Sequence, residues 1–166
     1  MRSSPATVVL VLFAACTTAD PSAAAYEATL RPLFRANSQL AISVINLAAD
    51  AHDKRVDVGA VQSRWRTAIV PSSEHIAWQA AVADVPEDWT ETHDQLVAIW
   101  GQRAAAYRDL DFAIRDARRE AWTQAGESVN ESQVAEEAWV AEVVKILDSR
   151  GVRLDPYPTT GCCLTP

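Results

Sequence analysis

The chain has 166 residues, of which 49% are hydrophobic and 22% are charged, and its formal net charge at pH 7 is −7. This length and apolar content suit a single domain with a sizeable core. The negative charge disfavours binding to nucleic acid, because like charges repel, so we expect no nucleic-acid partner.

The first element along the chain is a short apolar run, residues 7–16 (TVVLVLFAAC), which follows Arg2. It falls well short of the roughly 20 apolar residues that a membrane-spanning helix needs. A positive charge, an apolar run and small residues in this order are typical of a secretory signal peptide. A buried core helix is the alternative, and the lack of amphipathic spacing in the run disfavours it.

The end of this run, residues 12–16 (LFAAC), resembles the lipobox of bacterial lipoprotein precursors. The resemblance implies that residues 1–15 are removed and that Cys16 carries a lipid anchor, followed by a tether over 16–22. It also implies a location in the bacterial cell envelope, which in a Gram-negative cell is the outer membrane facing the periplasm. An ordinary secretory signal with an incidental cysteine is the alternative.

Two amphipathic helices are predicted next. The first covers residues 23–51, where apolar side chains recur at spacings of three and four and so share one helix face. Pro32 either kinks this helix or marks its first turn. The second covers residues 58–83, and we expect a break or bend near Pro71 because proline supplies no backbone donor.

The third and fourth helices complete the predicted set. The third, over 85–125, is the longest, and Gly126 ends it as a left-handed cap. The fourth follows a capping-box pattern, NESQ at 130–133, and runs to about Arg150. Gly151 ends it.

Four amphipathic helices joined by short turns favour an all-α, up-down antiparallel bundle over 23–151, with an irregular tail over 152–166. In this arrangement the start of the first helix, the turn at 84–88 and the end of the fourth helix meet at the end nearest the membrane. The predicted turn at 126–131 points away from it.

The tail contains the adjacent pair Cys162 and Cys163. If Cys16 is acylated, these two form an even pair in an oxidising compartment. A disulfide between neighbours is strained, because Cα atoms about 3.8 Å apart fall below the usual range of about 4.4–6.8 Å. Unpaired or intermolecular thiols, a vicinal disulfide, and a metal or redox role are therefore three open interpretations.

A histidine pair is the leading candidate for bound chemistry. His75 and His93 lie nine residues before and nine residues after Asp84, so antiparallel helices that turn there place both imidazoles at similar height. The potential ligands for Zn²⁺, Cu²⁺ or Ni²⁺ are Glu74, His75, Glu91, His93 and Asp94. The alternative is that both histidines are partly buried and bonded to carboxylates. Haem and di-iron motifs are absent from the sequence, and we expect no cofactor.

Four tryptophans could either be buried in the bundle or lie exposed on its surface. Trp78 and Trp89 flank the 84–88 turn, where they pack as an aromatic plug or meet a lipid interface or a partner. Trp122 and Trp139 form a partner-facing patch near the third turn, or they pack between the last two helices.

Polar residues inside the apolar stripes are a further signal. Asn37 and Arg103 interrupt the stripes of the first and third helices at comparable heights. They predict a buried polar contact that fixes the register of the bundle, and a ligand-binding arginine is the alternative. The mixed-charge run at 108–120 is interpreted as a solvated helix face, with a docking strip for another coil as the second interpretation.

No nucleophile elbow, phosphate-binding loop or pair of catalytic carboxylates is recognisable, so we do not expect an enzyme. The sequence favours a lipid-anchored envelope protein that acts by protein contacts, as a scaffold or adaptor. Its partners would be the membrane, through Cys16, and a protein of the envelope. The alternative is a periplasmic sensor or buffer of a divalent transition metal that uses His75 and His93.

Overall fold

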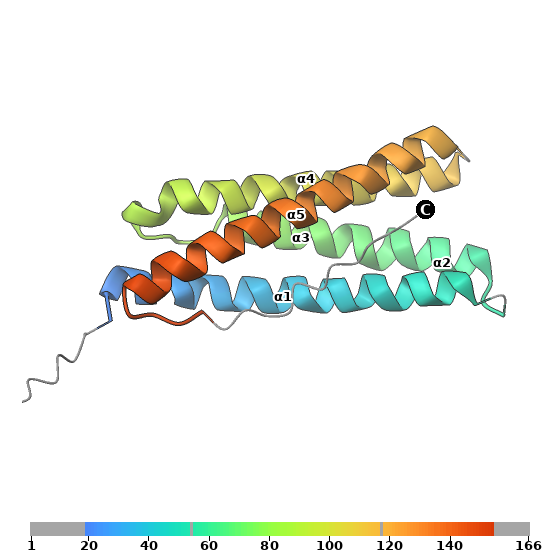
Figure 1. Cartoon of the computed structure of the whole chain (residues 1–166). Helices are drawn as coiled ribbons and strands as arrows, with labels where there is room; N and C mark the ends of the chain where they lie inside the picture. The colour runs from blue at the N-terminus through green and yellow to red at the C-terminus, as the bar shows by residue number, and fades with distance from the viewer. Residues whose placement is uncertain (1–18, 54, 117, 155–166) are drawn as a thin grey trace, which may run out of the picture.

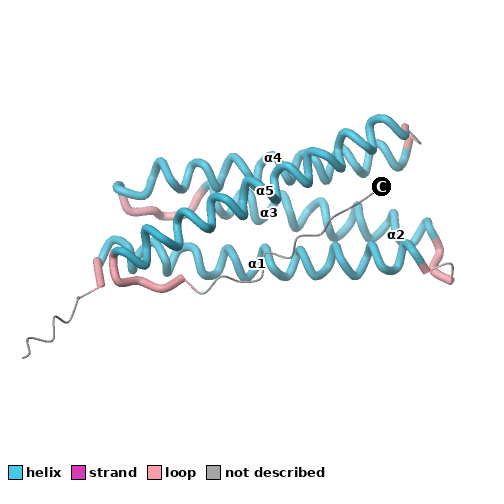
Figure 2. The backbone as a smooth tube through the Cα atoms, in the orientation of Figure 1, coloured by secondary structure: helices cyan, strands magenta, loops and turns pink. Residues whose placement is uncertain are grey.

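Four helical rods lie side by side in the computed structural model, which describes residues 19–53, 55–116 and 118–154 (Figure 1). The described residues form helices and loops and no strand, which confirms the predicted all-α bundle (Figure 2). The second rod is continuous and contains α2, a π-helical segment η1, and α3. The bounds are α1 (Pro21–His52), α2 (Val58–Arg64), η1 (Trp65–Ile69), α3 (Val70–Ala81), the 3₁₀ turn η2 (Glu87–Trp89), α4 (Thr90–Arg115) and α5 (Arg119–Ser149).

The start of α1 follows from its capping residues. The Asp20 carboxylate accepts a hydrogen bond of 2.9 Å from the backbone N–H of Ser22, and Pro21 occupies the first turn, where its missing donor costs nothing. Pro32 lies inside α1 without ending it. The predicted first helix, 23–51, is therefore confirmed to within two residues at each end.

The second rod stays helical across Pro71, and the predicted break takes the form of a wider turn. In η1 the backbone N–H of Val70 bonds to the carbonyl of Trp65, five residues back. Pro71, the second residue of α3, has no N–H and its ring crowds the preceding turn. A π-helical turn immediately before it accommodates the ring without interrupting the rod.

The predicted third helix is wrong in its length. It ends at Arg115, so α4 has 26 residues and is shorter than α1, which has 32. The backbone N–H of Arg118 bonds to the carbonyl of Ala113 at 2.9 Å, the six-residue bond of a Schellman motif. This motif, rather than a glycine, closes α4.

The predicted turn at 126–131 does not exist, because Gly126 and the NESQ segment both lie inside α5. The end of the last helix is predicted correctly. Gly151 has a φ of 75°, and the backbone N–H of Val152 bonds to the carbonyl of Leu147 at 2.9 Å, again as in a Schellman motif.

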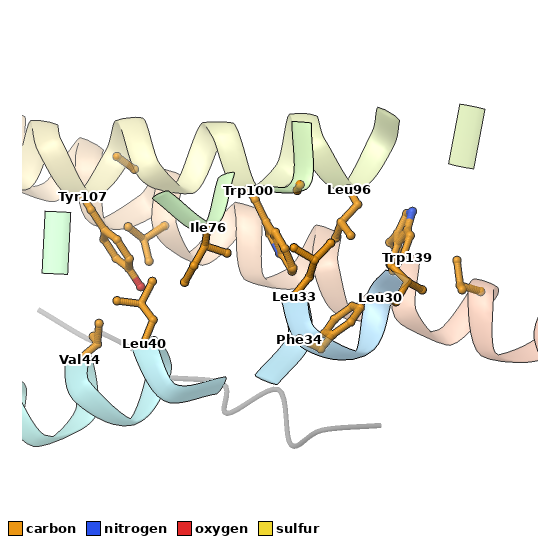
Figure 3. Close-up of a cluster of buried hydrophobic side chains, with 14 of the residues drawn as sticks. Leu30, Leu33, Phe34, Leu40, Val44, Ile76, Leu96, Trp100, Tyr107 and Trp139 are labelled. Atoms are coloured by element: carbon orange, nitrogen blue, oxygen red, sulfur yellow. The ribbon is translucent and has the colours of Figure 1, made fainter. Parts of the chain in front are cut away.

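The core runs along the whole bundle and is rich in aromatic rings. Phe34 of α1 meets Trp100 edge to face, with ring centroids 5.5 Å apart, and is stacked near Trp139 of α5 at 6.1 Å. Figure 3 shows Tyr107 pointing from α4 toward Leu40 of α1. These contacts join α1, α4 and α5 through the middle of the bundle.

The two ends of the bundle are built differently. At one end, here named the Asp20 end, the backbone N–H of Asp20 bonds to the carbonyl of Arg150 at 3.0 Å, and the Thr29 hydroxyl bonds to the carbonyl of Asp84 at 3.1 Å. The α1–α2 and α4–α5 turns lie at the opposite end, here named the Arg118 end (Figure 1). The predicted meeting of the three chain segments at one end is confirmed.

The packed domain also reaches further than predicted. Val152 and Leu154, assigned to the irregular tail, are buried against the bundle. Within the described ranges, no helix is both long and apolar enough to cross a membrane.

Candidate functional site

Two large aromatic side chains are exposed at the Arg118 end. Phe112, in the last turn of α4, is 38% exposed, and Trp122, in the first turns of α5, is 47% exposed. Aromatic rings normally bury most of their surface, so a pair of them beside one turn marks a candidate contact surface. We name the set Phe112, Ile114, Arg118, Arg119 and Trp122 the Arg118 surface.

Two surface hollows give this surface its shape. One, of about 340 Å³, is lined by Ala113, Ile114, Arg118, Arg119 and Trp122. The other, of about 260 Å³, includes Phe112 and Arg118 among its lining residues. Arg118 borders both hollows, so the two form neighbouring parts of one surface.

The local charge of this surface differs from that of the chain. Residues 115–120 carry three arginines and two carboxylates, a positive excess in a protein whose net charge is −7. Asp116 is shared by Arg115 at 3.3 Å and Arg118 at 3.5 Å. Arg119 forms no ion pair with any residue in the described part of the chain.

A buried polar cluster lies midway along the bundle. The Arg103 guanidinium is 2.5 Å from the Glu136 carboxylate, and the Asn37 amide donates to the other carboxylate oxygen at 2.7 Å. Arg103 also donates to the hydroxyl of Ser132 at 3.1 Å and to its carbonyl at 3.0 Å. The predicted polar contact between Asn37 and Arg103 therefore exists through Glu136.

Sequence reasoning missed Glu136 and Ser132, although a signal was present. The buried positions of α5 recur at spacings of three and four: Ala125, Val129, Ser132, Glu136, Trp139, Val143 and Leu147. This stripe becomes visible only when the helix starts before residue 126, because Ser132 and Glu136 then fall between apolar residues on one face.

The structure does not bring the five predicted metal ligands together. Among the described residues no three His, Cys, Asp or Glu side chains lie close enough to hold a metal ion. His93 is buried, with Nε2 2.9 Å from the carbonyl of Ala80 and Nδ1 3.4 Å from the Tyr26 hydroxyl. His75 lies on the exposed face of α3, Glu74 pairs with Arg108 at 3.1 Å, and Glu91 and Asp94 are exposed.

The histidines miss each other because the connection between their helices is asymmetric. His93 lies beside Ala80, so the two helices turn nearer to residue 87 than to Asp84. His75 precedes Ala80 by five residues in α3, so it lies about 7.5 Å further from the turn than His93 does. The alternative of carboxylate partners is also wrong for His93, which contacts a carbonyl and a tyrosine hydroxyl.

The tryptophans of the Asp20 end separate into one buried and one exposed residue. Trp89 is buried and stacks on Tyr26, with ring centroids 4.4 Å apart, while the Arg150 guanidinium lies 4.9 Å from its centroid. Burial raises the pKa of the Tyr26 hydroxyl above its ordinary value. Trp78 is 58% exposed, so the predicted plug contains Trp89 and Tyr26 and excludes Trp78.

The predicted patch of Trp122 and Trp139 is wrong, because only Trp122 is on the surface. Trp139 is buried, and its indole N–H donates to the carbonyl of Thr92 at 2.7 Å, so it packs between α4 and α5. Both residues lie on α5, where positions 17 apart differ by about 100° around the axis. They therefore cannot share one face.

The three cysteines, Cys16, Cys162 and Cys163, lie outside the described residues, so acylation and the state of the pair stay predictions. Comparison of the chain with protein-family models, with curated proteins and with solved structures found no match.

Proposed function

We propose that the protein is a lipid-anchored helical bundle of the bacterial cell envelope that acts by protein–protein contacts, as a scaffold or adaptor. The lipobox-like segment at 12–16 supports the anchor. Only a few residues separate Cys16 from Asp20, so a lipid on Cys16 would hold the Asp20 end of the bundle close to the membrane surface.

The observation that carries the contact function is the position of the Arg118 surface. It lies at the end of the bundle opposite Asp20 (Figure 1). The helix α1 joins the two ends with 32 residues, about 48 Å at 1.5 Å per residue. A membrane-held bundle would therefore present Phe112 and Trp122 well away from the lipid, where a partner can reach them.

The chemistry of the surface indicates the kind of partner. Aromatic side chains and arginine are the residues enriched in protein interfaces and in their hot spots. The hollow beside Trp122 would accept an apolar side chain, and Arg119 is available to a carboxylate of the partner. We propose an envelope protein that offers an apolar residue flanked by acidic ones.

The anchor is tested by metabolic labelling with a radioactive fatty acid in a bacterium that processes lipoproteins. The wild-type protein is expected to take up label and to sediment with membranes, and Cys16→Ser is expected to lose both properties. The double variant Cys162→Ser/Cys163→Ser is the matched control and keeps the label. Labelling that survives Cys16→Ser would contradict the anchor.

The contact surface is tested by crosslinking in intact envelopes. We expect one specific crosslinked band for the wild type. Its intensity is expected to fall about tenfold, equivalent to about 1.4 kcal/mol of binding free energy, in the double variant Phe112→Ala/Trp122→Ala and in the charge reversal Arg119→Glu. Trp78→Ala removes an exposed indole at the Asp20 end and is expected to keep the band. Equal loss in all three variants would contradict the assignment of this surface.

A further inference from the structure

A third hollow, of about 320 Å³, lies between α1 and the second rod, away from the Arg118 surface. Its polar lining comes from Gln39 and Ser43 of α1 and from Ser72, His75 and Gln79 of α3. We name it the α1–α3 groove. Its volume is at the lower end of the range of about 300–1,000 Å³ that is typical of small-molecule sites.

The π-helical turn helps to form this groove. Ala68 and Ile69, the last residues of η1, line it together with Ala36 of α1. The small side chains of Ala36 and Ala68, at different heights along the groove, leave space that larger side chains would fill. Short π-helical turns occur frequently at functional sites, because they redirect side chains within an otherwise regular helix.

The lining offers hydrogen-bonding groups, and His75 is its one titratable side chain. No Asp, Glu, Lys or Arg side chain lines the groove. The side chains of Gln39, Ser72 and Gln79 make no hydrogen bond to any residue of the described ranges. Ser43 donates its hydroxyl to the Gln39 carbonyl at 2.9 Å, and its oxygen can still accept a bond.

A flat apolar face adjoins these polar groups. The Trp78 ring stacks on the His75 ring, with centroids 5.8 Å apart and planes 22° apart. His75 lines the groove and Trp78 does not, so the 58% exposed indole lies beside the groove, next to His75. An indole beside amides and hydroxyls suits a ligand that has both apolar and polar faces.

We propose that the α1–α3 groove binds a neutral oligosaccharide. The C–H face of a pyranose ring would pack on Trp78, and ring hydroxyls would bond to Gln39, Gln79 and Ser72. An anionic ligand would meet no lysine or arginine in the groove and would be repelled by the field of an acidic protein, whereas a cation would meet no carboxylate there. The proposal is independent of the protein partner proposed above.

The test uses the full-length protein purified with detergent present throughout, and it measures binding by saturation-transfer NMR. Chitotetraose and cellotetraose are the neutral probes, and an oligogalacturonate of equal length is the charged probe. We expect at least one neutral probe to bind and the charged probe to bind about tenfold more weakly. Trp78→Ala and the double variant Gln39→Ala/Gln79→Ala are each expected to weaken neutral binding about tenfold.

Trp122→Ala is the matched control, since it removes an exposed indole at the other end of the bundle, and it is expected to bind as the wild type does. Circular dichroism of every variant checks that the helices persist. Neutral binding that is absent, or that survives both groove variants, would overturn the proposal. A Trp78→Ala variant that loses affinity for phosphatidylcholine vesicles but none for sugars would also overturn it, in favour of a lipid contact.

Discussion

Arg103 and Glu136 form an ion pair of 2.5 Å in which both side chains are almost fully buried, 8% and 4% exposed. Removing two charges from water costs several kcal/mol, and their attraction compensates for this only when further hydrogen bonds satisfy both groups. Here the Ser132 hydroxyl accepts a hydrogen bond from Arg103, and the Asn37 amide donates one to Glu136. The cluster joins α1, α4 and α5 at one height, so a shift of α4 or α5 along its axis would separate the two charges, and a shift of α1 would break the hydrogen bond from Asn37.

Glu136→Ala is expected to destabilise the protein by about 3–5 kcal/mol, because it leaves the Arg103 guanidinium buried without its counter-charge. The double variant Arg103→Met/Glu136→Leu removes both charges. Its free energy of unfolding is expected to lie within about 1 kcal/mol of the wild-type value or above it. Urea denaturation followed by circular dichroism measures both. A double variant less stable than Glu136→Ala would show that the pair contributes net stability.

Asn37→Leu tests the third member of the cluster. It removes a hydrogen bond to a charged group, which contributes about 1.5–3 kcal/mol, while Glu136 keeps Arg103 as its partner. We expect a loss of that size, smaller than the loss in Glu136→Ala. Gln39→Ala, on the same helix but exposed, is the control and is expected to change the unfolding free energy by less than about 0.5 kcal/mol.

The sequence predicted α1 well because its capping residues and its apolar spacing agree. It misplaced the turn between α4 and α5 because the chain there carries no glycine or proline. The end of α5, in contrast, is followed by Gly151, which the sequence predicted as its cap. The hydrogen bond from the backbone N–H of Arg118 to the carbonyl of Ala113 closes α4 without that signal.

The candidate sites were less predictable than the helices, because each depends on which residues face each other across the bundle. Trp122 and Trp139 lie on different faces because both belong to one helix, α5. The predicted turn at 126–131 wrongly placed them on two helices. The α1–α3 groove is lined in part by the π-helical turn η1, and Pro71 predicted an irregularity there but not that it would be a π-helical turn. The pairing of Glu136 with Arg103 likewise required the correct start of α5.

Asp88, which bonds to Ser22 and Arg150, makes the stability of the Asp20 end depend on pH. Hydrogen bonds from the Ser22 hydroxyl and from Arg150, at 2.8 Å, lower the pKa of Asp88 below its ordinary value because they favour the ionised carboxylate. Its contribution is therefore present above the unfolded-state pKa of about 3.9 and is lost as pH falls through the lower folded-state pKa.

Asp88→Asn is expected to lower the unfolding temperature at pH 7 slightly, since the group is exposed and screened by solvent. The difference from the wild type is expected to shrink as pH falls below about 3.9. Differential scanning calorimetry across this range measures it, with Asp94→Asn, an exposed position without an ion pair to a described residue, as the control. A difference that grows toward low pH would contradict the assignment.

Metal addition tests the separation of His75 from His93. A ligand that binds only the native state stabilises it, by about 2.7 kcal/mol at a free-ligand concentration one hundred times Kd, and so raises the unfolding temperature. Because the described residues hold no cluster of three potential ligands, excess Zn²⁺ is expected to leave the unfolding temperature unchanged. The experiment uses Cys162→Ser/Cys163→Ser, so that thiols do not bind the metal. A rise that disappears in His75→Ala would restore the predicted site.

Two glycines inside helices provide stabilising substitutions. Gly101 in α4 and Gly126 in α5 have open space where a Cβ would lie, with nothing within 4 Å. Gly101→Ala and Gly126→Ala are each expected to raise the unfolding free energy by about 0.5–1 kcal/mol, because alanine has less backbone freedom to lose in a helix. Urea denaturation measures the change.

Gly151→Ala is the contrasting variant, because Gly151 has a φ of 75°, which L side chains rarely adopt. Alanine in this left-handed conformation costs about 1–2 kcal/mol, so the variant is expected to be destabilised while the two helical variants are stabilised. If Gly126 capped a helix, as the sequence predicted, Gly126→Ala would lose stability as Gly151→Ala does. The sign of the Gly126→Ala effect therefore decides between a turn at 126–131 and a continuous α5.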